Sequence, residues 1–185
     1  MVIVITGVMA AGKSTVAQRL AERLPRSAHV RGDVFRRMIV GGRAEPTPDA
    51  AAEARAQLRL RYALSAAVAD GYAAAGFTAI VQDVILGTDL PAYREMVRTR
   101  PCHLVVLCPR PDVVAAREAA RPKTGYGEWS VEALDRELRE TPRHGLWLDN
   151  SDQTPEETVA TMIERLGWVE VQGQPPGPDS RITGT

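Results

Sequence analysis

The sequence predicts an α/β fold in which five parallel strands form one sheet and helices cover both of its faces. Five short runs are apolar throughout, as strands are when both faces of a parallel sheet are buried. Segments with helical periodicity separate these runs, and strands that alternate with helices are typical of a parallel sheet. The expected strands are Val2–Thr6, Ala28–Arg31, Thr78–Gln82, His103–Cys108 and Leu146–Leu148.

Each expected helix has its own start or stop signal. Apolar residues spaced four apart indicate the first helix, and Pro25 ends it. A long alanine-rich helix ends before Gly76. The last helix begins with the sequence of a capping box, in which Thr154 is the N-cap and Glu157 is its partner. The expected helices are Lys13–Leu24, Asp49–Ala75, Asp89–Arg98, Pro111–Arg121 and Pro155–Leu166.

The length of 185 residues is that of one domain with its own hydrophobic core. We expect this domain to span residues 1–168. Residues 169–185 are polar and rich in glycine and proline, so we expect them to form a flexible tail.

The composition argues against some classes of partner. The formal net charge is zero and the isoelectric point is about 6.8. Because broad nucleic-acid binders carry an excess of basic residues, the charge disfavours a nucleic-acid partner. No apolar run approaches the roughly 20 residues that a membrane span requires, and no signal peptide is visible. The sequence therefore predicts a cytoplasmic protein with no membrane partner.

Residues 7–14, GVMAAGKS, match the pattern G-x-x-x-x-G-K-[ST] at every fixed position. The match lies between an expected strand and an expected helix, which is the context that this phosphate-binding loop requires. Its glycines let backbone N–H groups turn toward phosphate oxygens, and the helix adds its positive dipole end. We expect Lys13 to bind the β- and γ-phosphates of ATP and Ser14 to bind Mg²⁺. The other expected nucleotide-binding residues of this loop are Gly7, Ala10, Ala11, Gly12 and Thr15.

Charged residues follow the second expected strand. Ligands of open parallel sheets bind beyond the carboxyl ends of the strands, which places Asp33 and Arg36 near the phosphate loop. Asp33 could accept the proton of an attacking hydroxyl as a general base, and Arg36 could orient the acceptor. The alternative is that Asp33 is a helix N-cap followed by solvent-exposed arginines.

Asp83 directly follows the third expected strand. A carboxylate at the end of a buried strand is costly without a partner. Asp83 could hold Mg²⁺ through water, or it could form a salt bridge with Arg36. It could also simply begin a loop.

Basic residues follow the fourth expected strand and predict a lid at about residues 112–130. Arg117 and Arg121 are four apart, so they share one helix face, and Lys123 follows in a glycine-containing segment. Arg117 and Arg121 could stabilise the charge of the transferred phosphate, while Lys123 could contact the donor phosphates or the acceptor. The alternative is a solvated basic face.

The loop after the fifth strand often contacts adenine in this kind of fold. Thr154 and Pro155 are therefore candidate nucleotide contacts, although helix capping explains both residues equally well.

Together these motifs resemble the small P-loop kinases of the group that contains chloramphenicol phosphotransferase-like enzymes, zeta toxins and the kinase module of polynucleotide 5′-kinases. The resemblance covers about residues 1–168 and rests on the phosphate loop, on Asp33-x-x-Arg36 and on Arg117-x-x-x-Arg121. It implies a P-loop NTPase fold with a helical lid. It also implies that Asp33 is the general base, that Arg36 contacts the acceptor and is braced by Asp83, and that the two lid arginines bind the donor phosphates.

The sequence thus predicts an ATP- and Mg²⁺-dependent phosphotransferase that moves the γ-phosphate to a hydroxyl group of a small molecule. A nucleic-acid 5′-end kinase is the first alternative, and the zero net charge disfavours it. A nucleotide-binding regulatory module that transfers nothing is the second. Asp33 argues against that module, because a switch needs no base on the acceptor side.

Overall fold

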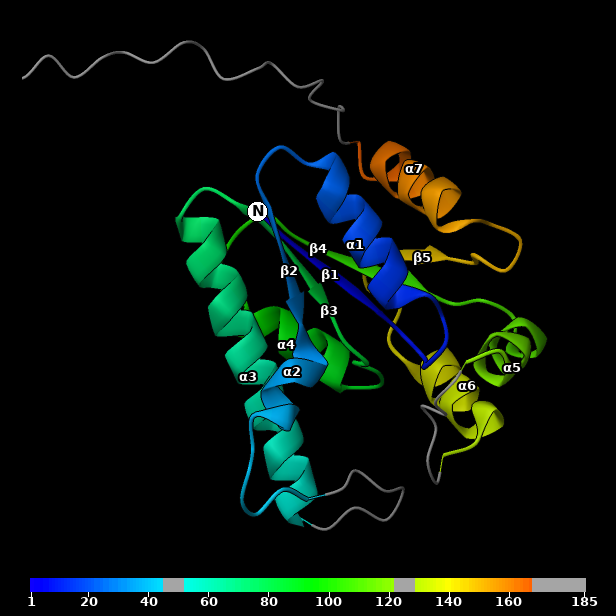
Figure 1. Ribbon diagram of the computed structural model, residues 1–185, viewed down its shortest axis with the longest axis horizontal. Helices are drawn as coiled ribbons and strands as arrows, with labels where there is room; N and C mark the ends of the chain where they lie inside the picture. Colours follow the sequence, from blue (N-terminus) through cyan, green and yellow to red (C-terminus); the bar gives the residue numbers. More distant parts are fainter. Residues whose placement is uncertain (45–51, 122–128, 168–185) are drawn as a thin grey trace, which may run out of the picture.

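A computed structural model describes residues 1–44, 52–121 and 129–167 of the chain. Five parallel strands form one sheet in the order β2-β3-β1-β4-β5 (Figure 1). The central strand, β1, pairs with β3 on one side and with β4 on the other. The strands are β1 (Val2–Gly7), β2 (Ser27–Arg31), β3 (Thr78–Gln82), β4 (Cys102–Leu107) and β5 (Leu146–Leu148).

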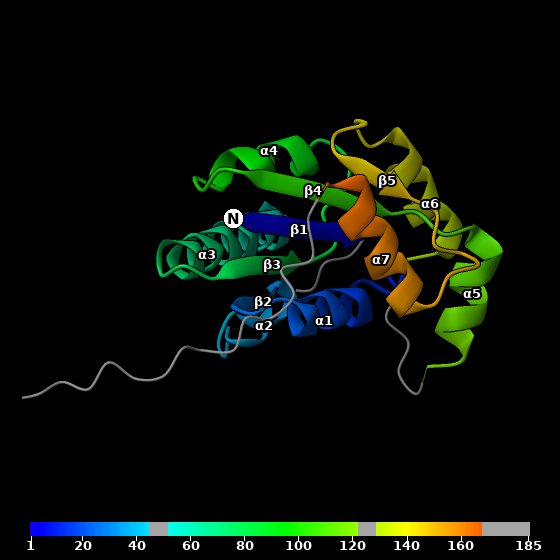
Figure 2. The same ribbon diagram turned by 90° about the horizontal axis from the view of Figure 1, so that it is seen from above.

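Helices cover both faces of this sheet. Helices α1 and α7 pack together on one face, and α3 and α4 pack together on the other, as Figure 2 shows. Helix α2 is a short helix directly after β2, and α5 and α6 follow β4 and contact each other. The helices are α1 (Lys13–Arg23), α2 (Gly32–Arg37), α3 (Ala52–Ala74), α4 (Asp89–Met96), α5 (Pro111–Ala119), α6 (Val131–Glu140) and α7 (Pro155–Arg165).

The core is built on β1, whose residues from Val2 to Ile5 are completely buried. Because the sheet is covered on both faces, successive residues of a strand are apolar rather than alternately apolar and polar. Helix α1 contributes Val16 and Leu20 to the same core, and α7 contributes Val159 and Met162. Removal of these side chains from water is the main force that holds the helices on the sheet.

The predicted fold class is confirmed, and the strand boundaries agree to within one residue. Two helices of the described chain, α2 and α6, were not among the expected helices, although a helix after the second strand was considered as an alternative. The start of α6 has a local signal, since the Ser130 hydroxyl accepts a hydrogen bond from the backbone N–H of Ala133 at 3.0 Å. Of the expected lid, residues 122–128 lie outside the described part of the chain. No helix among the described residues is long and apolar enough to span a membrane.

Candidate active site

The loop between β1 and α1 has a backbone that favours small residues. Gly7, Ala10 and Gly12 have φ angles of 143°, 60° and 92°. A Cβ on Gly7 would overlap the carbonyl oxygen of Leu107 on β4, so this position requires glycine. Glycine adopts a positive φ without steric cost, which lets the chain reverse between strand and helix.

The first turn of α1 presents free backbone donors at the end of this loop. The N–H of Val16 donates to the carbonyl oxygen of Gly12 at 3.0 Å. The N–H groups of Lys13, Ser14 and Thr15 precede that bond, so the helix supplies no acceptor for them. With the positive end of the helix dipole, these groups form a site that favours an anion.

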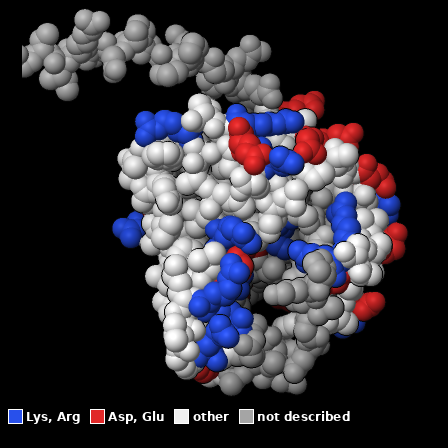
Figure 3. Space-filling model, viewed as in Figure 1, with Lys and Arg blue, Asp and Glu red and all other residues white. Residues whose placement is uncertain are grey.

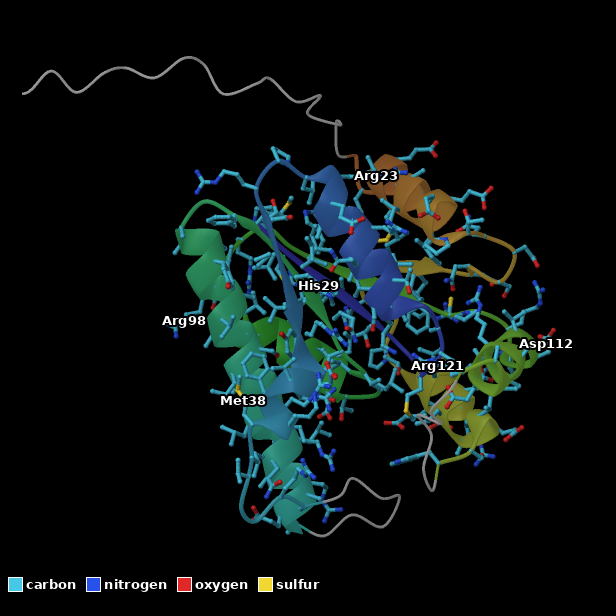
Figure 4. All side chains as sticks on the ribbon, viewed as in Figure 1. Arg23, His29, Met38, Arg98, Asp112 and Arg121 are labelled. Carbon is cyan, nitrogen blue, oxygen red and sulfur yellow. The ribbon has the colours of Figure 1, made fainter. Side chains whose placement is uncertain are left out.

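Lys13 is buried at the same place, with 6% of its surface exposed. Its Nζ donates a hydrogen bond to the carbonyl oxygen of Val8 at 2.6 Å. Burial, followed by the positive charges of Arg121 and Arg61, lowers the pKa of Lys13 from 10.5 to about 7. Figure 4 shows Arg121 after helix α5, on the side of the molecule where β1 ends. Cations from the loop, α3 and the end of α5 therefore converge here, and a bound phosphate would supply the charge that balances them.

The Ser14 hydroxyl lies beside the end of β3. Its Oγ donates to Oε1 of Gln82 at 3.1 Å, and Gln82 is buried. Oxygen atoms of this kind are the ligands that Mg²⁺ prefers. No cluster of three or more His, Cys, Asp or Glu side chains in the described part of the chain could hold a metal ion alone. A Mg²⁺ ion at Ser14 would therefore depend on phosphate and water oxygens as well.

Asp33 lies in the first turn of α2, directly after β2. The N-cap of this helix is Arg31, so the alternative that Asp33 is the N-cap does not hold. Nη2 of Arg37 lies 2.9 Å from Oδ2 of Asp33. The other oxygen, Oδ1, is buried and has no hydrogen-bond partner among the described residues, and Nε of Arg31 lies 3.8 Å from it as a longer ion pair. One carboxylate oxygen is thus able to accept a proton from a bound hydroxyl.

Arg36, the residue expected to contact the acceptor, donates a long hydrogen bond, 3.4 Å, to the carbonyl oxygen of Ala44.

Asp83 is completely buried and is held by Arg61 of α3. Nε of Arg61 donates to Oδ2 of Asp83 at 2.8 Å, and Nη2 donates to Oδ1. The backbone N–H of Val84 also donates to Oδ1, at 2.7 Å. A buried carboxylate needs such a bidentate partner. The structure gives Asp83 this partner, Arg61, where we expected Mg²⁺ or Arg36.

The two lid arginines point to different parts of the site. Nη2 of Arg117 donates to the carbonyl oxygen of Asn150 at 2.9 Å, in the loop after β5. Nη1 of Arg117 is buried without a hydrogen-bond partner among the described residues. Arg121 forms an ion pair of 3.2 Å with Glu118 while its charge acts on Lys13. The third cation expected in the lid, Lys123, lies outside the described residues.

In the loop after β5, Asn150 contacts the phosphate loop, whereas Thr154 and Pro155 form the start of α7. The Thr154 hydroxyl accepts from the N–H of Glu157 at 3.2 Å in a capping box. Nδ2 of Asn150 donates to the carbonyl oxygen of Ala11 at 3.1 Å, and its Oδ1 is buried without a partner in the described chain. Sequence reasoning missed Asn150. The only indication in the sequence is that Asn150, with its amide side chain, closely follows the last expected strand.

The surface of the described residues includes a smaller and a larger hollow. One of about 370 Å³ borders the start of α1 and is lined in part by Ser14, Thr15 and His29. The other, of about 680 Å³, lies at the amino ends of β4 and β5, beside Cys102 and Gly145. Ligands of open parallel sheets bind at the carboxyl ends of the strands. The smaller hollow extends from there along Gln18, Arg19 and Glu22 of α1, so only its Ser14 end borders the candidate site.

Known structures with the same fold include three kinases. A sugar kinase from Janibacter sp. HTCC2649 is 21% identical with a TM-score of 0.66, and the match covers 90% of this chain and 94% of that one. Shikimate kinase from Aquifex aeolicus is 20% identical (TM-score 0.62; 90% and 96% covered). A gluconokinase from Sinorhizobium meliloti 1021 is 22% identical (TM-score 0.55; 89% and 94% covered). These likenesses show an α/β P-loop NTPase fold.

No curated protein matches the sequence. A family model described as "AAA domain" matches residues 2–143, which include the phosphate loop, Asp33, Asp83 and both lid arginines. The match covers more than half of the chain, and the chain therefore belongs to this AAA domain family.

Proposed function

We propose that the protein is an ATP-dependent phosphotransferase that moves the γ-phosphate of ATP to a hydroxyl group of a small molecule. The observation that carries this proposal is the position of Asp33 and the lack of a hydrogen bond to one of its carboxylate oxygens. Asp33 lies at the carboxyl end of β2, on the same edge of the sheet as the phosphate loop, and its buried Oδ1 accepts no hydrogen bond from the described residues, although Nε of Arg31 lies 3.8 Å from it. A protein that only binds nucleotide needs no such acceptor atom.

Three groups of residues have separate roles in the proposed reaction. The phosphate loop and Lys13 bind the β- and γ-phosphates, and Ser14 binds Mg²⁺ with Gln82 beside it. Asp33 takes the proton of the attacking hydroxyl, while Arg36 contacts the acceptor. Arg117 and Asn150 have unpartnered buried polar atoms near the loop after β5, and we assign them to the nucleotide.

Structural neighbours of the fold support a small hydroxyl compound as acceptor. The names of the three solved neighbours describe kinases of sugars, shikimate and gluconate, all of which carry several hydroxyl groups. The nucleotide is proposed to be ATP with Mg²⁺, and the protein is proposed to act in the cytoplasm.

A screen of hydroxyl compounds tests this function. Sugars, polyols, nucleosides and hydroxylated antibiotics are each incubated with the protein, ATP and Mg²⁺, and ADP release is compared with the rate without acceptor. Asp33→Asn is expected to lower turnover with a true acceptor by about 10²–10⁴, the usual contribution of a general base. Binding of a non-hydrolysable ATP analogue should remain. Loss of that binding instead would place Asp33 in the nucleotide site and contradict its role as a base.

One observation favours a nucleic-acid 5′-end kinase as the second candidate. Figure 3 shows a column of basic side chains over α2 and the first turns of α3. Residues 31–44 and 52–61 hold two acidic residues, Asp33 and Glu53, against seven arginines: Arg31, Arg36, Arg37, Arg43, Arg55, Arg59 and Arg61. A chain with zero net charge therefore concentrates positive charge on the acceptor side.

Salt dependence separates the two candidates. Acceptor affinity is measured between 50 and 200 mM salt for each acceptor that is phosphorylated. We expect little change for a small molecule, because few phosphates are neutralised. A slope of log affinity against log salt steeper than about −3 would identify a nucleic-acid end, and Arg55→Ala should then flatten it by about one unit.

A further inference from the structure

Arg61 is connected to the phosphate loop through the end of β3. Ser14 of the loop donates its hydroxyl hydrogen bond to Gln82, the last residue of β3, at 3.1 Å. The next residue is Asp83, whose carboxylate holds Arg61 through two guanidinium nitrogens. Ser14 and Arg61 are therefore held by two successive residues at the end of β3, Gln82 and Asp83.

The same ion pair also borders the acceptor side. Gly32, the first residue of α2, lies so close to Asp83 that a Cβ on it would overlap the carboxylate. Asp33, the proposed base, directly follows this glycine. The carboxylate that fixes Arg61 is thus enclosed between the phosphate loop and the start of the helix that holds Asp33.

One nitrogen of the Arg61 guanidinium makes no hydrogen bond to the described residues. Nε and Nη2 are bound to Asp83, whereas Nη1 has no hydrogen bond to any described residue, and the side chain is 15% exposed. Burial is the main cause that lowers the pKa of Arg61, and the charge of Asp33 opposes that shift. The charge of Arg61 in turn reaches Lys13. One arginine thus interacts with both the phosphate-binding lysine and the proposed base.

Building on the proposed function, we propose that Arg61 is a catalytic residue that donates from Nη1 to the phosphoryl group during its transfer. In that step the bond from the γ-phosphorus to the oxygen of ADP breaks. The bond to the acceptor oxygen forms, and the acceptor proton passes to Asp33. Negative charge spreads over the three remaining phosphoryl oxygens, which a fixed guanidinium stabilises without having to reorganise. Asp83 is the positioning residue, since it holds two of the three nitrogens and thereby aims the third.

Binding of a transition-state mimic tests Arg61 without any acceptor. The dissociation constant of ADP with Mg²⁺ is measured with and without aluminium fluoride, which mimics the phosphoryl group in transfer. The wild-type protein should bind ADP more tightly in the presence of aluminium fluoride. Arg61→Ala should reduce this tightening by about 10- to 100-fold, the range of a hydrogen bond to a charged group, and change ADP binding alone by no more than about threefold.

Arg59→Ala is the matched control, because Arg59 is an exposed arginine of the same helix and should leave the tightening unchanged. Arg61→Lys keeps the charge but not the fork, and should recover only part of the effect. Asp83→Asn should weaken the tightening less than Arg61→Ala, since the guanidinium remains but is held less firmly.

Arg61→Ala leaves a buried carboxylate without its partner and could fail to fold. The double variant Arg61→Met/Asp83→Asn removes both charges and provides the second test, with the same loss of tightening expected. Wild-type tightening in either folded variant overturns the proposal, as does a wild-type protein that binds ADP but shows no tightening. If the wild-type protein fails to bind ADP, the proposed function itself fails, so the two failures are distinguishable.

Discussion

At the scale of single residues, the buried positive charge of Lys13 is costly in the ligand-free protein. We expect a bound nucleotide to make the same charge favourable. Its ammonium is buried next to two arginine charges, which lowers its pKa to about 7. A bound phosphate reverses this situation because it supplies the opposite charge at short range. We therefore expect Lys13 to contribute to nucleotide binding rather than to the stability of the ligand-free fold.

Replacement of this lysine should separate stability from binding. Lys13→Met is expected to leave the melting temperature of the ligand-free protein unchanged or higher, since a buried charge is removed. A non-hydrolysable ATP analogue with Mg²⁺ at about 100 times its dissociation constant should stabilise the wild-type protein by about 2.7 kcal/mol. The variant should lose that response in a thermal-shift measurement. A normal response would refute the assignment of the phosphate site.

Gly32 is the second residue for which the structure predicts the effect of a substitution on stability. Gly32→Ala would place a methyl group on the Asp83 carboxylate, and we expect an overpacking cost of about 1–3 kcal/mol in chemical denaturation. Gly41→Ala is the control, because no atom lies within 4 Å of a Cβ built there. Equal stability of the two variants would show that the ion pair can move aside without cost.

At the scale of elements, the sequence predicted the strands best. Each strand is a continuous apolar run because both faces of the sheet are covered, so the signal lies within the strand itself. Helix α2 has only six residues, too few to show a helical period, and α6 follows the expected lid without a proline to mark its start. Residues 131–140 do show a strong amphipathic pattern after Ser130, and a search for serine N-caps would have found it.

The loop after β5 and the start of α7 give a prediction about two neighbouring roles. Thr154→Ala removes a capping box on the surface and should cost about 1 kcal/mol of stability with little change in ATP affinity. Asn150→Ala removes the hydrogen bond to Ala11 and should weaken ATP binding more than Thr154→Ala does. Titration with the nucleotide and denaturant unfolding measure the two effects. A larger loss of affinity in Thr154→Ala would restore it as a nucleotide contact.

At the scale of the whole molecule, local and distant parts of the site differ in how far a sequence reveals them. The phosphate loop is one continuous segment, so its pattern specifies its structure. The contact between Asn150 and Ala11 joins residues 139 positions apart, and the pair of Arg61 with Asp83 joins residues 22 apart. Such pairs depend on how α3 crosses the sheet and where β5 ends, which no local pattern records.

The domain boundary gives a whole-molecule prediction. Helix α7 packs on α1, and residues up to Gly167 account for the described fold. Deletion of residues 169–185, predicted from composition to be a flexible tail, should leave the melting temperature within about 2 °C and ATP affinity within about twofold. A larger drop in either measurement would show that this segment belongs to the domain.

The close approach of Gly32 to the ion pair of Arg61 and Asp83 limits which amino-acid substitutions these positions can accept. Positions 32, 61 and 83 share one small volume, so a side chain at any of them limits the other two. Substitutions at these positions should then be non-additive: Gly32→Ala should cost less in a protein that already carries Asp83→Ala and Arg61→Met. Among homologous sequences, the same volume predicts that a larger residue at position 32 accompanies the loss of both charges. The three positions are expected to change together or to stay together.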